Sequence, residues 1–211
     1  VVACNTVSAV ALQTVIDLSP VPVHSHIEHE AKAVVKATRS GRIGVIGTYT
    51  TVSSKAYDRM ISLLDAQSAT TVYSQACPLF VPLAEEGWHH HAATRLIAEE
   101  YLAPLKQANV DTLILGCTHY PLLADIIAEV MPGVQLIDSG EESALVAKNI
   151  LSTTASAHAP QRERRIDCYV TDKPAKFGVV AERFLGFPLR NIHQIAIDEL
   201  PPLHSEQMSI H

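Results

Sequence analysis

The segment between Asp111 and Leu123 limits the possible fold more than any other part of the chain. Its apolar run, residues 113–115, ends at Gly116 and is followed by polar residues. Short continuous apolar runs are typical of strands in parallel sheets, which are buried on both faces. A helix-like apolar pattern opens at Pro121, and proline suits a first helical turn because its missing N–H has no partner there. The segment predicts a strand, a turn and a helix.

The same alternation of strand and helix continues along the chain. Further strands are predicted at residues 20–24, 42–47, 71–73, 134–137 and 166–170, beside the central strand at 112–116. Helices are predicted at residues 6–18, 28–39, 53–65, 92–107, 141–151 and 175–185, with residues 48–51 as a loop, residues 152–161 as a linker and Gly41 as a helix cap. This order predicts an α/β fold with mainly parallel sheets flanked by helices.

Two strand ends carry the same short pattern of a small residue, a cysteine and polar residues. The first places Cys4 before Asn5 and Thr6, either of which would cap the next helix, and the second contains Cys117. Ligands bind α/β sheets just past the carboxyl ends of strands. A helix start and a neighbouring His119 predict a lowered pKa for the Cys117 thiol. The repeat predicts a pseudo-symmetric site with one proton-transfer group on each face of a substrate.

Other polar side chains near these strand ends have both a functional and a structural interpretation. Thr118 and His119 lie where a ligand would bind, although a histidine there can also be a cap or a surface residue. Asn5 and Thr6 could serve only as a helix cap, but a cap that lies at the site can also bind a carboxylate. A buried cysteine is usually an inert small apolar residue, and this is the interpretation of Cys77 and Cys168.

Composition excludes several classes of protein. The 211 residues carry a net charge of −6, which argues against non-specific binding to nucleic acid or to an anionic membrane surface. Apolar segments are interrupted by polar residues, so no membrane span is predicted. The four cysteines have no spacing typical of a metal site or a disulfide framework. We expect no metal, and a reducing cytoplasm is the natural compartment.

Five motifs together resemble those of glutamate racemases. They are Ala-Cys-Asn-Thr-x-Ser-Ala at residues 3–9, Gly-Val-Ile-Gly-Thr at 44–48 with Thr51 and Ala56-Tyr57, Ala-Cys-Pro-Leu-Phe-Val-Pro-Leu at 76–83 followed by Glu85-Glu86-Gly87, Gly-Cys-Thr-His-Tyr-Pro-Leu-Leu at 116–123, and Leu-Ile-Asp-Ser-Gly at 136–140. The resemblance covers nearly all of residues 1–190. It breaks between Ser25 and Glu30, where His29 stands in place of an expected proline.

The resemblance implies two pseudo-symmetric α/β domains that face each other across a cleft holding the active site. Residues 32–140 would form the second domain. The first would be assembled from residues 1–31, residues 141–211 and a further segment before the first cysteine motif. A homodimer is a possible assembly, and the small-molecule partner would be glutamate.

The same resemblance implies a racemase that interconverts L- and D-glutamate without a cofactor and supplies D-glutamate for peptidoglycan. Cys4 would take the proton from D-glutamate and Cys117 from L-glutamate, with His119 assisting. The family also places a supporting glutamate after residue 83, and Glu86 is preferred here over Glu85. Substrate contacts are expected from Asn5, Thr6, Thr118 and His119, and from the cleft-lining Thr48 and Thr51.

Three other functions remain open at this point. An aspartate racemase of the same superfamily is the nearest, although that branch tends to carry glutamate in place of His119. A catalytically silent binding protein could use the same cleft. A zinc-binding domain is suggested by the histidines at residues 89–91, but no four ligands cluster in the sequence, and an exposed helix start explains this tract better.

Overall fold

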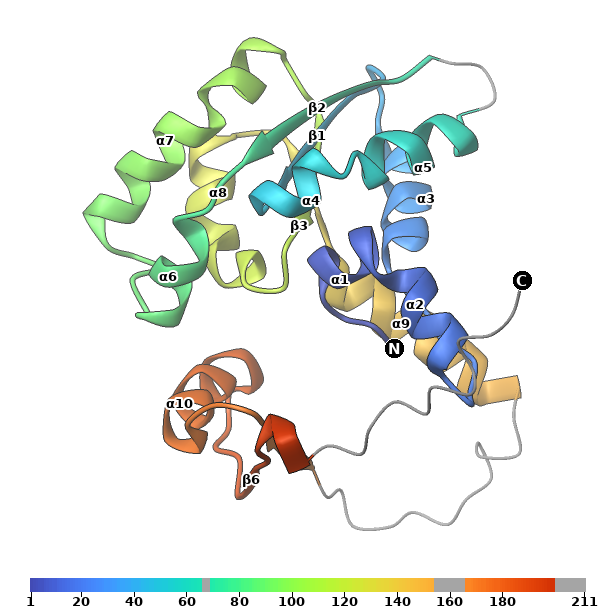
Figure 1. Ribbon diagram of the computed structural model, residues 1–211. Coiled ribbons are helices and arrows are strands. Elements are labelled where there is room, and N and C mark those ends of the chain that lie inside the picture. Colours follow the sequence, from blue (N-terminus) through green and yellow to red (C-terminus); the bar gives the residue numbers. More distant parts are fainter. Residues whose placement is uncertain (66–68, 154–165, 200–211) are drawn as a thin grey trace. The chain divides into compact units, whose positions relative to one another are not determined.

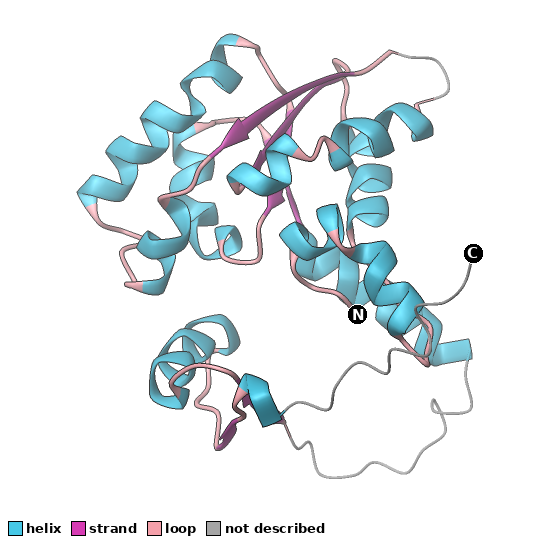
Figure 2. Ribbon diagram, viewed as in Figure 1, coloured by secondary structure: helices cyan, strands magenta, loops and turns pink. Residues whose placement is uncertain are grey.

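The computed structural model describes residues 1–65, 69–153 and 166–199 (Figure 1). The chain divides into two compact units, Val1–Ala157 and His158–His211, and each has its own parallel sheet. Helices flank the sheet of the first unit on both faces (Figure 2). The predicted α/β fold with parallel sheets is confirmed.

The first unit is built on a four-stranded parallel sheet with the order β2-β1-β3-β4. Its strands are β1 (Arg42–Gly47), β2 (Thr71–Ala76), β3 (Thr112–Gly116) and β4 (Gln135–Asp138). β3 is buried along its whole length because it pairs with β1 on one side and β4 on the other. The two central strands therefore carry the continuous apolar runs that the sequence showed.

Helices pack on both faces of this sheet. The helices described in this unit are, in chain order, α1 (Asn5–Val10), α2 (Leu12–Leu18), α3 (Ile27–Ala37), α4 (Tyr49–Ser53), α5 (Ala56–Leu64), α6 (Phe80–Glu85), α7 (Ala92–Gln107), α8 (Ala124–Val130) and α9 (Ser139–Thr153), with a 3₁₀ turn, η1, at Tyr120–Leu123. α3 and α5 cover one face, and α7 and α8 cover the other (Figure 1).

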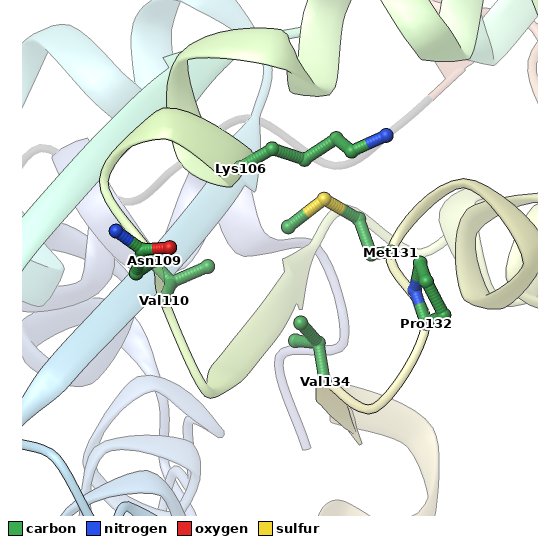
Figure 3. A pocket seen from close by; sticks show the side chains of 6 residues that line it. All are labelled: Lys106, Asn109, Val110, Met131, Pro132 and Val134. Carbon is green, nitrogen blue, oxygen red and sulfur yellow. The ribbon is translucent and has the colours of Figure 1, made fainter.

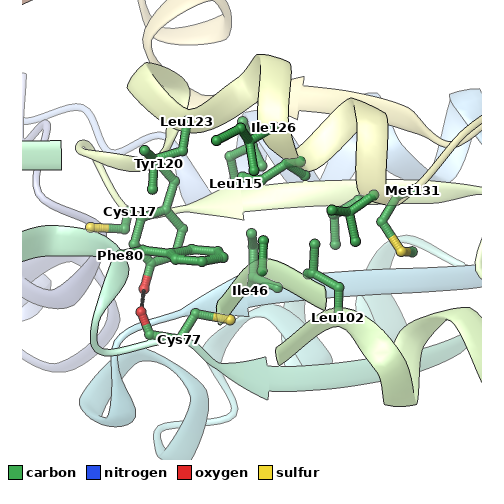
Figure 4. Close-up of a cluster of buried hydrophobic side chains, with 14 of the residues drawn as sticks. Ile46, Cys77, Phe80, Leu102, Leu115, Cys117, Tyr120, Leu123, Ile126 and Met131 are labelled. Carbon is green, nitrogen blue, oxygen red and sulfur yellow. Dashed lines mark hydrogen bonds between the residues drawn. The ribbon is translucent and has the colours of Figure 1, made fainter. Parts of the chain in front are cut away.

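Side chains of the central strands alternate between these two faces, as the pleat of a strand requires. Leu113 and Leu115 of β3 point into the core beneath α7 and α8 (Figure 4). Ile114 points to the opposite core with Ile43 and Val45 of β1, beneath α3 and α5. The sheet is fixed from both sides, so the loops at its carboxyl edge are held on a rigid base.

A half-buried carboxylate fastens the opposite, amino edge of the sheet. Asp111, just before β3, accepts hydrogen bonds from the Thr38 hydroxyl at 2.7 Å and from the backbone N–H groups of Arg39 and Ser40. Burial alone would raise the pKa of Asp111, but these donors together lower it well below its usual value. Asp111 thereby ties the turn between α3 and β1 to β3.

A hollow of about 260 Å³ also lies at the amino edge (Figure 3). It is lined by Lys106, Asn109, Val110, Met131, Pro132 and Val134. Val110 and Val134 precede β3 and β4, so this hollow is at the opposite end of the strands from Cys117.

The region before α3 differs from the prediction. Residues 20–24 are described and form no strand, and only Val2 and Ser25 make an isolated parallel bridge. Pro20 and Pro22 have no N–H to donate to a ladder, which explains the failure. The helix predicted at residues 6–18 is two helices, α1 and α2, because the backbone leaves helical geometry at Ala11.

Two turns after β1 and α3 also differ from the prediction. Residues 48–51 were expected as a loop, but Thr48 caps a short helix, α4, and its side chain accepts a hydrogen bond from the Thr51 N–H. Gly41 was expected to cap the preceding helix, and Thr38 is the cap instead. Gly41 adopts the left-handed conformation, φ 72°, three residues later.

The second unit contains a small strand–helix–strand motif. β5 (Asp167–Val170) pairs in parallel with β6 (Asn191–Gln194), and α10 (Pro174–Leu185) connects them and ends at Gly186 in the left-handed conformation. β6 was not predicted, and neither was α6 of the first unit. Most of the linker predicted at residues 152–161 lies outside the described residues.

Candidate active site

Cys117 follows the central strand β3, as predicted. The residue before it must be glycine, because a Cβ on Gly116 would lie 2.6 Å from the carbonyl oxygen of Ile46 on β1. Gly47, the register partner of Gly116, also lies at this seam. The close approach of β1 and β3 therefore brings the Cys117 turn beside the start of α4.

The Cys117 thiol is only 7% exposed. Burial raises its pKa to about 11, although the backbone N–H groups of His119 and Tyr120 act in the opposite direction and Cys4 adds to the rise. The prediction of a lowered pKa is wrong for this conformation. The reason is structural: a 3₁₀ turn follows Cys117 rather than an α-helix, and its few N–H groups do not offset the burial.

His119 lies between the Cys117 thiol and a carboxylate. Its Nδ1 is 4.0 Å from the Cys117 sulfur, and its Nε2 is 3.4 Å from an oxygen of Glu85. A carboxylate on Nε2 favours the tautomer with the proton on that nitrogen, which leaves Nδ1 as the acceptor. Nδ1 is also 3.4 Å from the Thr118 hydroxyl. His119 can thus exchange a proton with Cys117.

Of the two adjacent glutamates, the structure brings Glu85 to His119. Glu85 is the last residue of α6 and is half-buried, whereas Glu86 caps the helix and is exposed. The sequence alone could not separate two neighbours on one turn, and it favoured Glu86. Trp88 begins the loop beyond, where it stacks on His91.

The loop that carries Cys117 is anchored to the neighbouring loop after β2. The Tyr120 hydroxyl donates to the carbonyl oxygen of Cys77 at 2.8 Å (Figure 4). The Phe80 ring meets the Tyr120 ring edge-to-face at a centroid distance of 5.3 Å. The Cys77 thiol is fully buried, and burial raises its pKa far above the usual value, which agrees with the inert role expected for it.

Cys4 stands at the start of α1 and is exposed. Its sulfur accepts the Val7 N–H at 3.5 Å, so Cys4 itself is the helix cap that the sequence assigned to Asn5 or Thr6. Thr6, two residues after Cys4, contacts Thr48 and Thr51 beyond β1, and β1 ends beside Gly116. The fold therefore places the first cysteine motif next to the loops at the carboxyl ends of β1 and β3.

Three threonines join the start of α1 to α4. The hydroxyl of Thr6 lies 3.0 Å from that of Thr48 and 3.1 Å from that of Thr51, and the last two are 3.0 Å apart. Thr51 is buried, and the other two are half-buried. These predicted site residues are thus a single hydroxyl cluster next to Cys4.

Asn5 is part of a buried polar chain that the sequence did not reveal. Its side-chain nitrogen donates to the Tyr57 hydroxyl at 2.8 Å, and the Tyr57 hydroxyl donates to the Glu30 carboxylate. These three residues come from α1, α5 and α3. The amphipathic pattern of α3 and α5 gave no signal for this contact, because a glutamate on a helix is ordinarily a surface residue and the partners lie on different helices.

Metal binding finds no support within the described ranges 1–65, 69–153 and 166–199. No group of three or more histidine, cysteine, aspartate or glutamate side chains there could hold an ion. In the histidine tract, His91 caps α7 by accepting the Ala93 N–H through Nδ1. This agrees with the helix-start interpretation of residues 89–91. None of the helices described within those ranges is long and apolar enough to span a membrane.

Comparison with known proteins assigns the chain to a family. Residues 1–147 match the family described as Asp/Glu/hydantoin racemase. The chain belongs to this family. The prediction of an amino-acid racemase is confirmed, and so is the resemblance to glutamate racemases on which it was based.

Curated members of this racemase family are similar over most of the chain. The glutamate racemase of Syntrophus aciditrophicus is 44% identical over 198 residues, which cover 93% of this chain and 73% of that protein. The glutamate racemase of Geobacter metallireducens is 43% identical over 199 residues, which cover 94% of this chain and 73% of that protein.

Solved racemase structures share the fold. A glutamate racemase isoform from Bacillus anthracis superposes with a TM-score of 0.83 at 33% identity. The glutamate racemase of Francisella tularensis, solved in complex with D-glutamate, has the same TM-score and identity. Each comparison covers 92% of this racemase chain and 72% of the other.

Proposed function

We propose that this racemase interconverts L- and D-glutamate with Cys4 and Cys117 as the two acid/base groups and without a cofactor. The observation that carries the proposal is that Tyr57 contacts both cysteine turns: its hydroxyl accepts from Asn5, next to Cys4, and its ring lies against Gly116, next to Cys117. The Francisella relative, solved with D-glutamate, supports glutamate as the substrate.

Two opposed groups suit the chemistry of inversion. The α-proton must leave one face of the carbon, and another must arrive on the other face. A single base would have to swing between the faces, whereas two fixed thiols need not move. The α-proton is a weak acid, so the carbanion that develops also needs oriented donors for its carboxylate.

The protonation state of the Cys117 thiol suits it to one of the two conversions. With a pKa of about 11, it is a thiol at neutral pH and is ready to deliver a proton. This suits the conversion of D-glutamate, in which Cys4 removes the proton and Cys117 returns one. For the reverse reaction Cys117 must lose its proton, and we assign its acceptance to His119 Nδ1, with Glu85 holding the tautomer.

The remaining predicted residues are assigned to substrate binding. The hydroxyls of Thr6, Thr48 and Thr51, together with Asn5, surround the start of α1 and can donate to a carboxylate. The Thr118 hydroxyl lies on the Cys117 side. Each can strengthen its hydrogen bond as negative charge builds up on the substrate, which is the basis of electrostatic catalysis.

The wider role is also a proposal. D-glutamate made by the enzyme would enter peptidoglycan, and the reaction would take place in the cytoplasm. The two-domain arrangement, with residues 32–140 in one domain, residues 1–31 and 141–211 in the other and the site in a cleft, remains a prediction from the family, as does a homodimer.

Circular dichroism of glutamate solutions tests the activity. The protein, dialysed against a chelator, should abolish the optical signal of L-glutamate and of D-glutamate at comparable rates, with no added pyridoxal phosphate. L-aspartate is the matched control and should keep its signal. Unchanged signals from both glutamate enantiomers would overturn the proposal, and faster loss from aspartate would indicate an aspartate racemase.

A further inference from the structure

A buried chain of hydrogen bonds runs from the first cysteine motif into the protein. Asn5 and Tyr57 are each 1% exposed, and Glu30 is fully buried. Asn5 donates to the Tyr57 oxygen at 2.8 Å, and the Tyr57 hydroxyl donates to Glu30. A buried carboxylate is costly for a fold to keep, so a chain of this kind calls for an explanation.

Glu30, the last acceptor, fixes the direction of both hydrogen bonds in this series. Tyr57 gives its one proton to a carboxyl oxygen of Glu30, which accepts it. The Tyr57 oxygen can then only accept, and the Asn5 side chain must present its nitrogen to it. Burial raises the pKa of Tyr57 well above its usual value, and Glu30 adds to this, so the proton stays in place. Glu30 thereby sets the orientation of the Asn5 amide.

Tyr57 also touches the second cysteine motif. A Cβ on Gly116 would lie 3.3 Å from the Tyr57 ring, so the ring lies against the backbone just before Cys117. The hydroxyl end of the same side chain holds Asn5, just after Cys4. One side chain therefore lies between the two catalytic turns, with its ring on one and its hydroxyl on the other.

We propose that Tyr57 and Glu30 are positioning residues for Cys4, an inference that rests on the proposed two-cysteine function. α1 has only six residues, so its own hydrogen bonds hold its first turn weakly. Thr6 ties this turn to α4, and Asn5 ties it to Tyr57. Loss of the Tyr57 hydroxyl releases one of the two ties and moves Cys4, while the ring still supports the Cys117 turn.

A reaction that needs only one base separates the two cysteines. In a glutamate with chloride on the β-carbon, a base removes the α-proton, the C–H electrons form a double bond and chloride leaves. The resulting enamine hydrolyses to a 2-oxo acid and ammonia. By the proposed assignment, elimination from the D-enantiomer uses Cys4 and elimination from the L-enantiomer uses Cys117. Chloride release from each enantiomer therefore reports on each thiol alone.

The test is Tyr57→Phe, which removes the hydroxyl and keeps the ring. We expect elimination from the D-enantiomer to fall by about tenfold or more, since a catalytic group displaced by about 1 Å loses up to about a hundredfold in rate. Elimination from the L-enantiomer should stay within about twofold. Tyr101→Phe is the matched control, because Tyr101 accepts a hydrogen bond from the Leu79 N–H and its ring also packs in the core. It should change neither rate.

The single variant leaves the Glu30 carboxylate and the Asn5 nitrogen buried without Tyr57, so it can lower stability. The double variant Tyr57→Phe, Glu30→Leu removes that carboxylate as well and should restore the thermal midpoint without restoring elimination from the D-enantiomer. Equal losses for both enantiomers, or recovery of the D-enantiomer rate together with stability, would show a purely structural role and overturn the inference. If the wild-type protein eliminates chloride from neither enantiomer, the proposed function itself fails.

Discussion

At the scale of single residues, two thiols in unlike surroundings would perform mirror-image tasks. Cys4 is exposed at a helix start, whereas Cys117 is buried beside His119. The proposed reaction needs both, because in that scheme each enantiomer requires one thiolate and one thiol. Neighbouring groups must therefore allow both the exposed and the buried thiol to give and take a proton. For Cys117 the neighbours that can do this are His119 and Glu85.

Serine variants of the two cysteines should therefore differ in the enantiomer that they affect. Cys4→Ser and Cys117→Ser should each lower racemisation by at least about a hundredfold, because an alkoxide is scarcely available near neutral pH. In the elimination assay, Cys4→Ser should lose activity mainly on the D-enantiomer and Cys117→Ser mainly on the L-enantiomer. If both variants lose the same enantiomer, one cysteine has only a structural role.

Glu85→Gln and Glu86→Gln form a second matched pair. Glu85 lies 3.4 Å from His119 Nε2, and its carboxylate favours the tautomer that can accept the Cys117 proton. Glu85→Gln should lower kcat by about tenfold to a hundredfold, a typical effect for a residue that orients a functional histidine. Glu86→Gln should have a much smaller effect. The reverse ranking in steady-state kinetics would restore the first choice, Glu86.

At the scale of elements, the catalytic turn depends on how closely β1 and β3 approach. A Cβ on Gly116 would meet the Ile46 carbonyl oxygen at 2.6 Å, and backbone in the middle of a sheet cannot move aside. A Cβ on Gly44 would meet the end of the Leu113 side chain at 2.8 Å, which can turn away. Gly116→Ala should thus destabilise the protein by about 2 kcal/mol or more, and Gly44→Ala by less, in denaturant unfolding. Equal losses of stability in the two variants would mean that the backbones of β1 and β3 can move apart to admit a side chain.

The Asp111 clamp at the other edge predicts a pH dependence of stability. Its pKa is lowered in the folded protein, so its contribution is present above the ordinary value near 3.8 and is lost as the pH falls further. Asp111→Asn should cost about 1–2 kcal/mol at pH 7. The difference in unfolding free energy between wild type and variant should shrink below about pH 4. A difference that stays constant down to pH 2 would contradict this account.

Strands and helices with a clear apolar pattern in their own sequence were predicted well. β1, β3 and α7 have the predicted bounds, because an apolar run between breakers or a long amphipathic pattern leaves little choice. The strand expected at residues 20–24 failed because two prolines weaken a ladder. The short helix α4 was missed because five residues are too few to show a period.

The candidate site divides in the same way. Cys4, Cys117 and the threonines were found because they lie in short contiguous motifs at strand ends. Glu30 and Tyr57 lie 27 positions apart on separate helices, and only the packing of α3 on α5 brings them together. The choice between Glu85 and Glu86 depends on the last turn of α6, which single-sequence patterns do not resolve.

At the scale of the whole molecule, the two units differ in how many side chains they bury. β3 is buried along its length, whereas α10 has no buried residue. Hydrogen exchange measured by mass spectrometry should thus be slowest in β1 and β3 and faster in α10 by orders of magnitude, because opening costs less where little apolar surface is buried. Equal protection would show that the apolar side chains of α10 are covered in solution.

The parallel pairing of β1 with β3 has a further consequence for how the protein is made. Gly47 and Gly116 are register partners, yet a long stretch of chain with β2, α6 and α7 lies between them. Pairings over such distances close late, because the entropy of a large loop is lost before the contact forms. During synthesis Cys4 leaves the ribosome well before Cys117 exists, so the proposed two-thiol site can be completed only after β3 has been made.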